Sequence, residues 1–153
     1  MKTTTRPRSS HPTGLHLMIR NPHPDKKHTG DCGTRALCLA LDLPYRSTWS
    51  KITQLIQSNY FYRYPGSDWQ ASKRTANGGV CKSIMEKFLF SHGWRYHYAK
   101  AGSVFKAENL PELCIAEQSG HWVCIRDGAV WDTHDSRGKR SKKLIGWFAP
   151  ARG

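Results

Sequence analysis

The chain has 153 residues, of which 38% are hydrophobic, and a formal net charge of +13. This length predicts one domain with its own hydrophobic core, and the composition excludes an intrinsically disordered chain. No apolar run approaches the roughly 20 residues of a membrane span, and the charged first residues lack the apolar segment of a secretory signal. We therefore expect a cytoplasmic protein with no membrane partner.

Residues 1–20 are basic and rich in proline, which predicts a flexible arm before a domain that spans residues 21–153. A first helix is expected to begin at the N-cap Asp31 and to end before Pro44. A second helix is expected over residues 47–58, with Ser47 as its N-cap.

Residues 59–79 are aromatic and contain glycine without periodicity, which predicts a long loop. A third helix is expected over residues 80–92, and Gly93 should end it. The rest predicts strands at residues 94–99, 113–117, 121–126, 129–133 and 144–149. Helices followed by strands predict an α+β fold, in which the N-terminal helices pack on a C-terminal antiparallel sheet.

The dipeptide Asp127-Gly128 favours a tight type I′ hairpin, and such a turn fixes the register of its strands. If Arg126 pairs with Ala129, then His121 and Asp132 share one face as diagonal neighbours, about 7–8 Å apart between backbones. Asp135 would point to the opposite face. Because the face with His121 also carries apolar side chains, we expect the first helix to cover it with its start near His121.

Cys32 stands at the start of the first helix, in the stretch GDCGTRALCLAL. Unpaired N–H groups at a helix start favour the thiolate, and a neighbouring imidazole can accept and return its proton. A carboxylate behind the ring fixes its orientation. Cys32, His121 and Asp132 are therefore candidates for a nucleophile, a general base and acid, and an orienting carboxylate.

The same residues also have structural interpretations. A cysteine in an apolar helix is often core filler. A histidine on a strand is often satisfied by the backbone, and an aspartate after a hairpin often caps a turn. Cys38, in the middle of the helix, is expected to be an inert core thiol, and Cys81 is a rival nucleophile.

The odd number of cysteines, five, favours free thiols over disulfides. Their spacing gives no pair of zinc ligands, and Cys124, three residues after His121, has no second ligand pair nearby. We expect neither a metal nor a cofactor.

The stretches DCGTRAL and GHWVCIRDGAVWDTHD resemble the papain-like cysteine peptidase superfamily, above all its compact Cys-His-Asp branch with the double-glycine leader peptidases. They are also similar to short proteins common in bacteriophage genomes. The resemblance spans about residues 21–148, although its motifs lie only in these two stretches. It implies a papain-like fold, an acyl-enzyme formed on Cys32 with His121 and Asp132 in support, and a phage-encoded protein in the host bacterial cytoplasm.

One position departs from this pattern. The leader peptidases place a glutamine for the oxyanion hole six residues before the cysteine, and here Lys26 occupies that position. Asn21 and His28 are candidate donors from the preceding segment. The departure leaves room for a catalytically inactive relative that binds substrates without cleaving them.

Two classes of function are consistent with the sequence. The first is a thiol hydrolase, a peptidase or isopeptidase. Its protein or peptide substrate would bind in a groove lined by Tyr62, Trp69 and Trp122. The sequence does not distinguish this hydrolase from a transferase that uses the same thiol. The second is a binder that grips nucleic acid or an acidic host protein through the basic arm and the loop over residues 137–143. A monomer is expected in either case.

Overall fold

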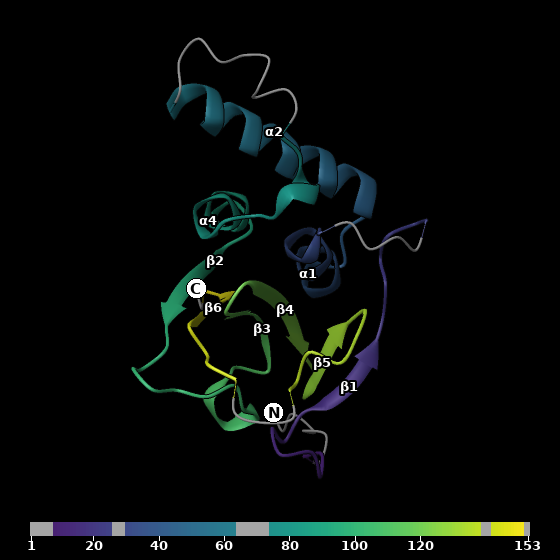
Figure 1. The fold of residues 1–153 in the computed structure, drawn as a ribbon, viewed down its shortest axis with the longest axis vertical. Helices are drawn as coiled ribbons and strands as arrows, with labels where there is room; N and C mark the ends of the chain where they lie inside the picture. Colours follow the sequence, from purple (N-terminus) through teal and green to yellow (C-terminus); the bar gives the residue numbers. More distant parts are fainter. Residues whose placement is uncertain (1–7, 26–29, 64–73, 139–141, 152–153) are drawn as a thin grey trace.

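A computed structural model describes residues 8–25, 30–63, 74–138 and 142–151. Within them the fold is mixed α+β, with three α-helices on one face of a six-stranded sheet (Figure 1). The helices are α1 (Cys32–Leu41), α2 (Tyr45–Arg63) and α4 (Lys82–Phe90). The strands are β1 (His16–Ile19), β2 (Trp94–Tyr98), β3 (Leu113–Gln118), β4 (His121–Arg126), β5 (Ala129–Asp132) and β6 (Gly146–Pro150). None of the described helices combines the length and apolarity needed to cross a membrane.

The sheet has the strand order β1-β5-β4-β3-β6-β2. All neighbouring pairs are antiparallel except β1 and β5, which run parallel with His16 opposite Ala129 and Ile19 opposite Asp132. Two expectations are therefore wrong: the sheet is mixed, and the segment over residues 1–20 contributes an edge strand rather than only a flexible arm. Leu15, which is buried, anchors this segment to the sheet.

The helix boundaries differ from the expected ones at α2. This helix begins at Tyr45 rather than after Ser47, whose hydroxyl donates to the carbonyl of Pro44 at 3.4 Å. It also continues to Arg63, so the expected loop over residues 59–79 is wrong for residues 59–63. The described end of that loop contains a short 3-10 helix, Ala76–Gly78.

Each face of the sheet has its own apolar cluster. The cluster with α1, α2 and α4 includes Trp122 and Cys124 of β4, and the cluster on the other face includes Val123 and Ile125. The first helix therefore covers the face opposite to the one expected. Both faces of β4 are apolar, so alternation of side chains does not specify which face receives the helix.

Two contacts align α1 along β4. At one end Arg126 donates from Nη1 to the carbonyl of Leu39 at 3.0 Å, and its guanidinium pairs with Asp42 at 3.0 Å. At the other end the Cys32 thiol lies close enough to His121 for the two groups to shift each other's pKa. The start of the helix therefore lies beside the start of the strand, which is the helix direction that the sequence analysis assumed.

Gly33 allows α1 to pack closely against the segment that precedes α4. A Cβ at Gly33 would lie 2.9 Å from Cβ of Val80, closer than such atoms approach. We expect Gly33→Ala to lower the free energy of unfolding by about 1–3 kcal/mol, as overpacking does, although alanine favours helix more than glycine does. Urea denaturation measures this change. Gly78→Ala, where a Cβ meets nothing within 4 Å, is the matched control and should be close to neutral.

Candidate functional site

Cys32 is the first residue of α1, where backbone N–H groups have no acceptor within the helix. The first backbone hydrogen bond of the helix joins the Arg35 N–H to the Asp31 carbonyl at 3.0 Å. The half-buried thiol lies close to the ring of His121 and to the backbone N–H of Trp122, and hydrogen bonding with these groups lowers its pKa. The helix start and the strand start thus meet at the sulfur atom.

The β4–β5 hairpin places an imidazole beside a carboxylate. His121 begins β4, Asp132 ends β5, and Nε2 of His121 lies 2.8 Å from Oδ2 of Asp132. The Asp132 side chain is only 6% exposed, and its Oδ1 accepts the backbone N–H of Thr133 at 2.7 Å. Since the carboxylate takes Nε2, the other ring nitrogen of His121, Nδ1, is the one left for Cys32.

The three groups shift one another's protonation. Burial raises the pKa of the Cys32 thiol, but the hydrogen bonds with His121 and the Trp122 N–H outweigh it and hold the pKa below 9.0. Burial lowers the pKa of His121, yet its bonds with Asp132 and Cys32 prevail and raise it to about 9. Burial raises the pKa of Asp132, and the bond with His121 outweighs it to keep the pKa below 3.8. These directions favour a thiolate–imidazolium pair near neutral pH.

The histidine titration offers a direct check of this pair. We expect the His121 ring to titrate near pH 9 in NMR spectra. In Cys32→Ala and in Asp132→Asn the midpoint should fall, because each change removes a negative partner of the imidazolium. Equal midpoints in all three proteins would show that these contacts do not couple the groups in solution.

Asp31, the residue before Cys32, belongs to a buried polar cluster. Asp31 has no solvent exposure, pairs with Arg35 at 3.2 Å, and accepts a hydrogen bond from the hydroxyl of Tyr45. Asp31 is the N-cap of α1, as expected, although its side chain makes no cap hydrogen bond. Asp31 instead ties the first turn of α1 to the start of α2. The ring of His23 packs on Tyr45 with centroids 4.5 Å apart, which brings residues 21–25 to the same place.

The comparison with known proteins adds nothing to this geometry. No family model, curated protein or solved structure matches the chain. The chemistry of the described side chains is therefore the basis for any function. A thiol, an imidazole and a carboxylate connected in this order can generate a nucleophile, move a proton to and from it, and keep the ring aligned.

The other cysteines have different surroundings. Burial raises the pKa of Cys38 to about 11 and that of Cys124 to about 12, and it also raises that of Cys114. These thiols suit the core. Cys81 is exposed at the N-cap of α4. Partial burial raises its pKa, but hydrogen bonds, led by that with Ser83, lower it overall, so Cys81 is a second ionisable thiol.

Donors for an oxyanion are available in the backbone. The N–H groups of Cys32, Gly33 and Thr34 precede the first hydrogen bond of the helix and lie at its positive end. Asn21, a candidate donor, follows β1, and its Oδ1 accepts the N–H of His23 at 3.0 Å, so its amide takes part in a local turn. The other candidate, His28, lies outside the described residues, as does Lys26.

Of the three residues expected to line a substrate groove, only Trp122 has a described side chain. Trp122 is buried beneath the helices, where its indole N–H donates to the carbonyl of Val80 at 2.8 Å. Its expected place in a substrate groove is therefore wrong, although its backbone N–H contacts the candidate thiol. Trp69 lies outside the described residues, and of Tyr62 only the backbone, within α2, is described.

Two residues of the basic loop over residues 137–143 make hydrogen bonds or an ion pair with other parts of the protein. Arg137 pairs with Asp135 at 2.9 Å and donates to the carbonyl of Leu15 at 3.1 Å, while Lys142 donates to the carbonyl of Ser136 at 3.3 Å. Asp135 is therefore occupied away from His121. The centre of the loop, residues 139–141, lies outside the described residues.

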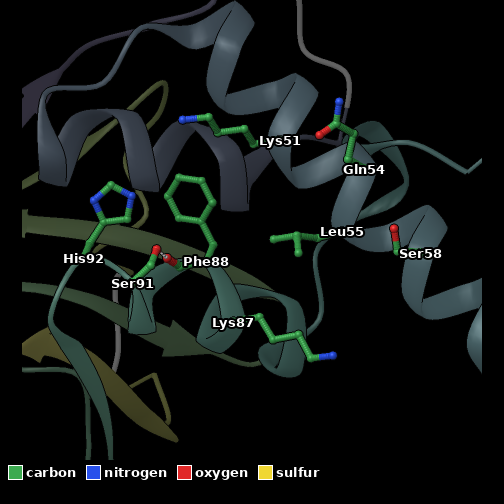
Figure 2. Close-up of a pocket in the computed structure, with 8 residues that line it drawn as sticks. All are labelled: Lys51, Gln54, Leu55, Ser58, Lys87, Phe88, Ser91 and His92. Atoms are coloured by element: carbon green, nitrogen blue, oxygen red, sulfur yellow. Dashed lines mark hydrogen bonds between the residues drawn. The ribbon is translucent and has the colours of Figure 1, made fainter.

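A basic cleft of about 390 Å³ lies between α2 and α4 and the turn that follows α4. Figure 2 shows Lys51 and Leu55 entering it from α2, and Lys87 and Phe88 from α4. His92 also lines it, and among the described residues that line the cleft there is no carboxylate. The cleft is built by residues other than the thiol, imidazole and carboxylate, so it is a separate, basic surface.

His134 is a neighbour of the site to which the sequence analysis gave no role. Its ring lies 5.4 Å from that of His121 between centroids, and it is 57% exposed. Together with His121 and Asp132 it forms a group of potential metal ligands. When the register set by Arg126 opposite Ala129 is continued along the hairpin, His134 comes opposite His121, so the sequence contained a signal for this proximity.

Proposed function

We propose that this protein is a papain-like thiol hydrolase that cleaves amide or isopeptide bonds in a protein or peptide. The observation that carries the proposal is the connected chain from the Cys32 thiol through the His121 ring to the Asp132 carboxylate. The opposite pKa shifts of Cys32 and His121 support it, because they supply a nucleophile and an acid together. The motif resemblance supports the papain-like type and a phage-encoded protein of the host cytoplasm.

The first chemical step forms an acyl-enzyme. The Cys32 thiolate attacks the carbonyl carbon, and the backbone N–H groups at the start of α1 hold the oxygen that becomes negative. The imidazolium of His121 donates its Nδ1 proton to the leaving amine as the C–N bond breaks. Asp132 keeps the ring in place through Nε2 and stabilises its charged form.

The second step restores the thiol. His121, now neutral, takes a proton from water at Nδ1, and the resulting hydroxide oxygen attacks the thioester carbon. The C–S bond breaks, the carboxylic acid leaves, and the thiolate–imidazolium pair is regenerated. An amine that replaces water in this step would make the same site a transferase.

The test combines thiol labelling with isotope incorporation. In a Cys81→Ser background, which removes the second ionisable thiol, iodoacetamide at pH 6 should label Cys32 faster than it labels a free-cysteine peptide. A peptide library incubated in ¹⁸O-water should then acquire one ¹⁸O at each new carboxyl terminus, and Cys32→Ala should abolish these products. Joined peptides without ¹⁸O would indicate a transferase. Slow, unselective labelling of Cys32 would contradict the proposal.

A nucleic-acid binder remains the second candidate, and one surface favours it. Tyr98 is 74% exposed, and the Lys82 amine lies 4.4 Å from the centre of its ring, a combination that suits stacking on a base beside a phosphate. With a net charge of +13, such binding would depend steeply on salt. Retention on single-stranded DNA that is lost between 50 and about 200 mM salt and unchanged in Cys32→Ala would favour this function. Retention that does not depend on salt, or no retention at all, would contradict nucleic-acid binding.

A further inference from the structure

Three potential ligand atoms converge on the outer side of the candidate triad. His121, Asp132 and His134 each offer one atom, and these atoms lie within 4.8 Å of one another. Asp132 stands between the two rings: its Oδ2 is 2.8 Å from Nε2 of His121, and its Oδ1 is 3.9 Å from Nδ1 of His134. Each carboxylate oxygen thus faces a different imidazole.

Two imidazoles and a carboxylate form a donor set that zinc prefers. Tetrahedral zinc holds nitrogen and oxygen ligands at about 2.0–2.2 Å, so its ligand atoms stand roughly 3.3 Å apart. The two separations at Asp132 are measured from different oxygens, so a zinc bound to one of them requires His134 or the carboxylate to shift. The adjustable member is His134, which is exposed and whose Nδ1 has a surface contact with the Thr133 hydroxyl at 3.2 Å that zinc would replace. The fourth position would face solvent beside His134.

We infer that His121, Asp132 and His134 bind Zn²⁺ and that the bound ion blocks the chemistry of the Cys32 thiol. The binding follows from the ligand geometry alone, whereas the block rests on the proposed function. Cys32 is not among the converging ligand atoms, and with Nε2 on the Asp132 side of the ring, Nδ1 is the nitrogen left for the thiol.

The block follows from the proton balance at His121. Zinc takes the lone pair of Nε2, and the proton held between Nε2 and Asp132 leaves to solvent. The ring then keeps one proton, on Nδ1. Donation of that proton to a leaving amine would produce a metal-bound imidazolate instead of a neutral imidazole, which makes His121 a much weaker acid. Formation of the acyl-enzyme should therefore slow.

The test is calorimetry of the full chain with zinc chloride at pH 7, compared across single variants. We expect one zinc per chain, release of about one proton on binding, and at least a tenfold loss of affinity in His134→Ala, since even outer contacts of a metal site change affinity by 10–100-fold. Cys32→Ala should bind zinc no more weakly than the unaltered chain, because loss of the thiolate lowers the pKa of His121 and eases release of its proton. His97→Ala, which removes another exposed histidine that stacks on Trp147, should bind as the unaltered chain does.

The outcomes separate this inference from the proposed function. Unchanged affinity in His134→Ala, loss of binding in Cys32→Ala, or no binding at all would overturn the zinc site. If the expected pattern of binding appears but the ¹⁸O experiment gives no products, the metal site stands and the hydrolase proposal fails. If both appear, zinc should inhibit hydrolysis by the unaltered chain, and His134→Ala should resist that inhibition; equal inhibition of the two would overturn the block.

Discussion

Asp31→Ala is expected to lower the free energy of unfolding by about 3–5 kcal/mol, the cost of removing one partner from a buried ion pair. Asp31 is fully buried, and the Arg35 side chain with which it pairs is 7% exposed. Without the carboxylate, the guanidinium charge stays in the interior and loses the counter-charge that Asp31 provides. The Tyr45 hydroxyl also loses the acceptor that Asp31 provided. Urea denaturation, monitored by tryptophan fluorescence, measures the change.

A second aspartate–arginine pair provides the control. Asp25 lies 3.9 Å from Arg46, and both side chains are more than half exposed. Exposed pairs contribute about 0–1 kcal/mol, so Asp25→Ala should change stability little. If Asp31→Ala and Asp25→Ala had similar small effects, the buried cluster would not be what holds α1 against α2. Tyr45→Phe should have an intermediate effect, since it removes one hydrogen bond to a charged group and keeps the ion pair.

The part of the site that local chemistry specifies could be predicted from the sequence. Asp127 and Gly128 both adopt positive φ, 53° and 73°, as a type I′ turn requires. The predicted pairing of Arg126 with Ala129 is confirmed. With the register known, only one of the nearby aspartates, Asp132, could share a face with the histidine. A two-residue turn therefore decides the position of a side chain four residues beyond it.

Features that depend on distant partners were not predictable in the same way. Both faces of β4 carry apolar side chains, so no local pattern distinguishes the face that α1 covers. The parallel pairing of β1 with β5 joins segments more than a hundred residues apart and has no turn signal. Asp31 matches an N-cap pattern, yet the tyrosine that engages its side chain, Tyr45, lies 14 residues further along the chain. In each case a contact between segments distant in the sequence decides the outcome.

Removal of the imidazole should change both the rate and the pH dependence of Cys32 labelling. In the unaltered chain His121 and the Trp122 N–H hold the pKa of Cys32 below its usual value, so the labelling rate should level off at a lower pH than in His121→Ala. In His121→Ala an ordinary thiol with a pKa of about 8.5 should show a rate that rises about tenfold per pH unit between pH 6 and 8. At pH 6 only about 0.3% of such a thiol is ionised, so we expect labelling to slow, even though a less acidic thiol is intrinsically more nucleophilic.

Hydrolysis should respond to pH differently from labelling, and the difference assigns the role of the ring. Labelling needs only the thiolate and should persist above pH 9, whereas cleavage also needs the imidazolium to protonate the leaving amine. Because the pKa of His121 is raised to about 9, hydrolysis should fall as pH rises through that value. Asp132→Asn should move this fall to lower pH, and Asp135→Asn, whose carboxylate pairs with Arg137, should leave it in place. Labelling and hydrolysis that decline together above pH 9 would mean that His121 is not the acid.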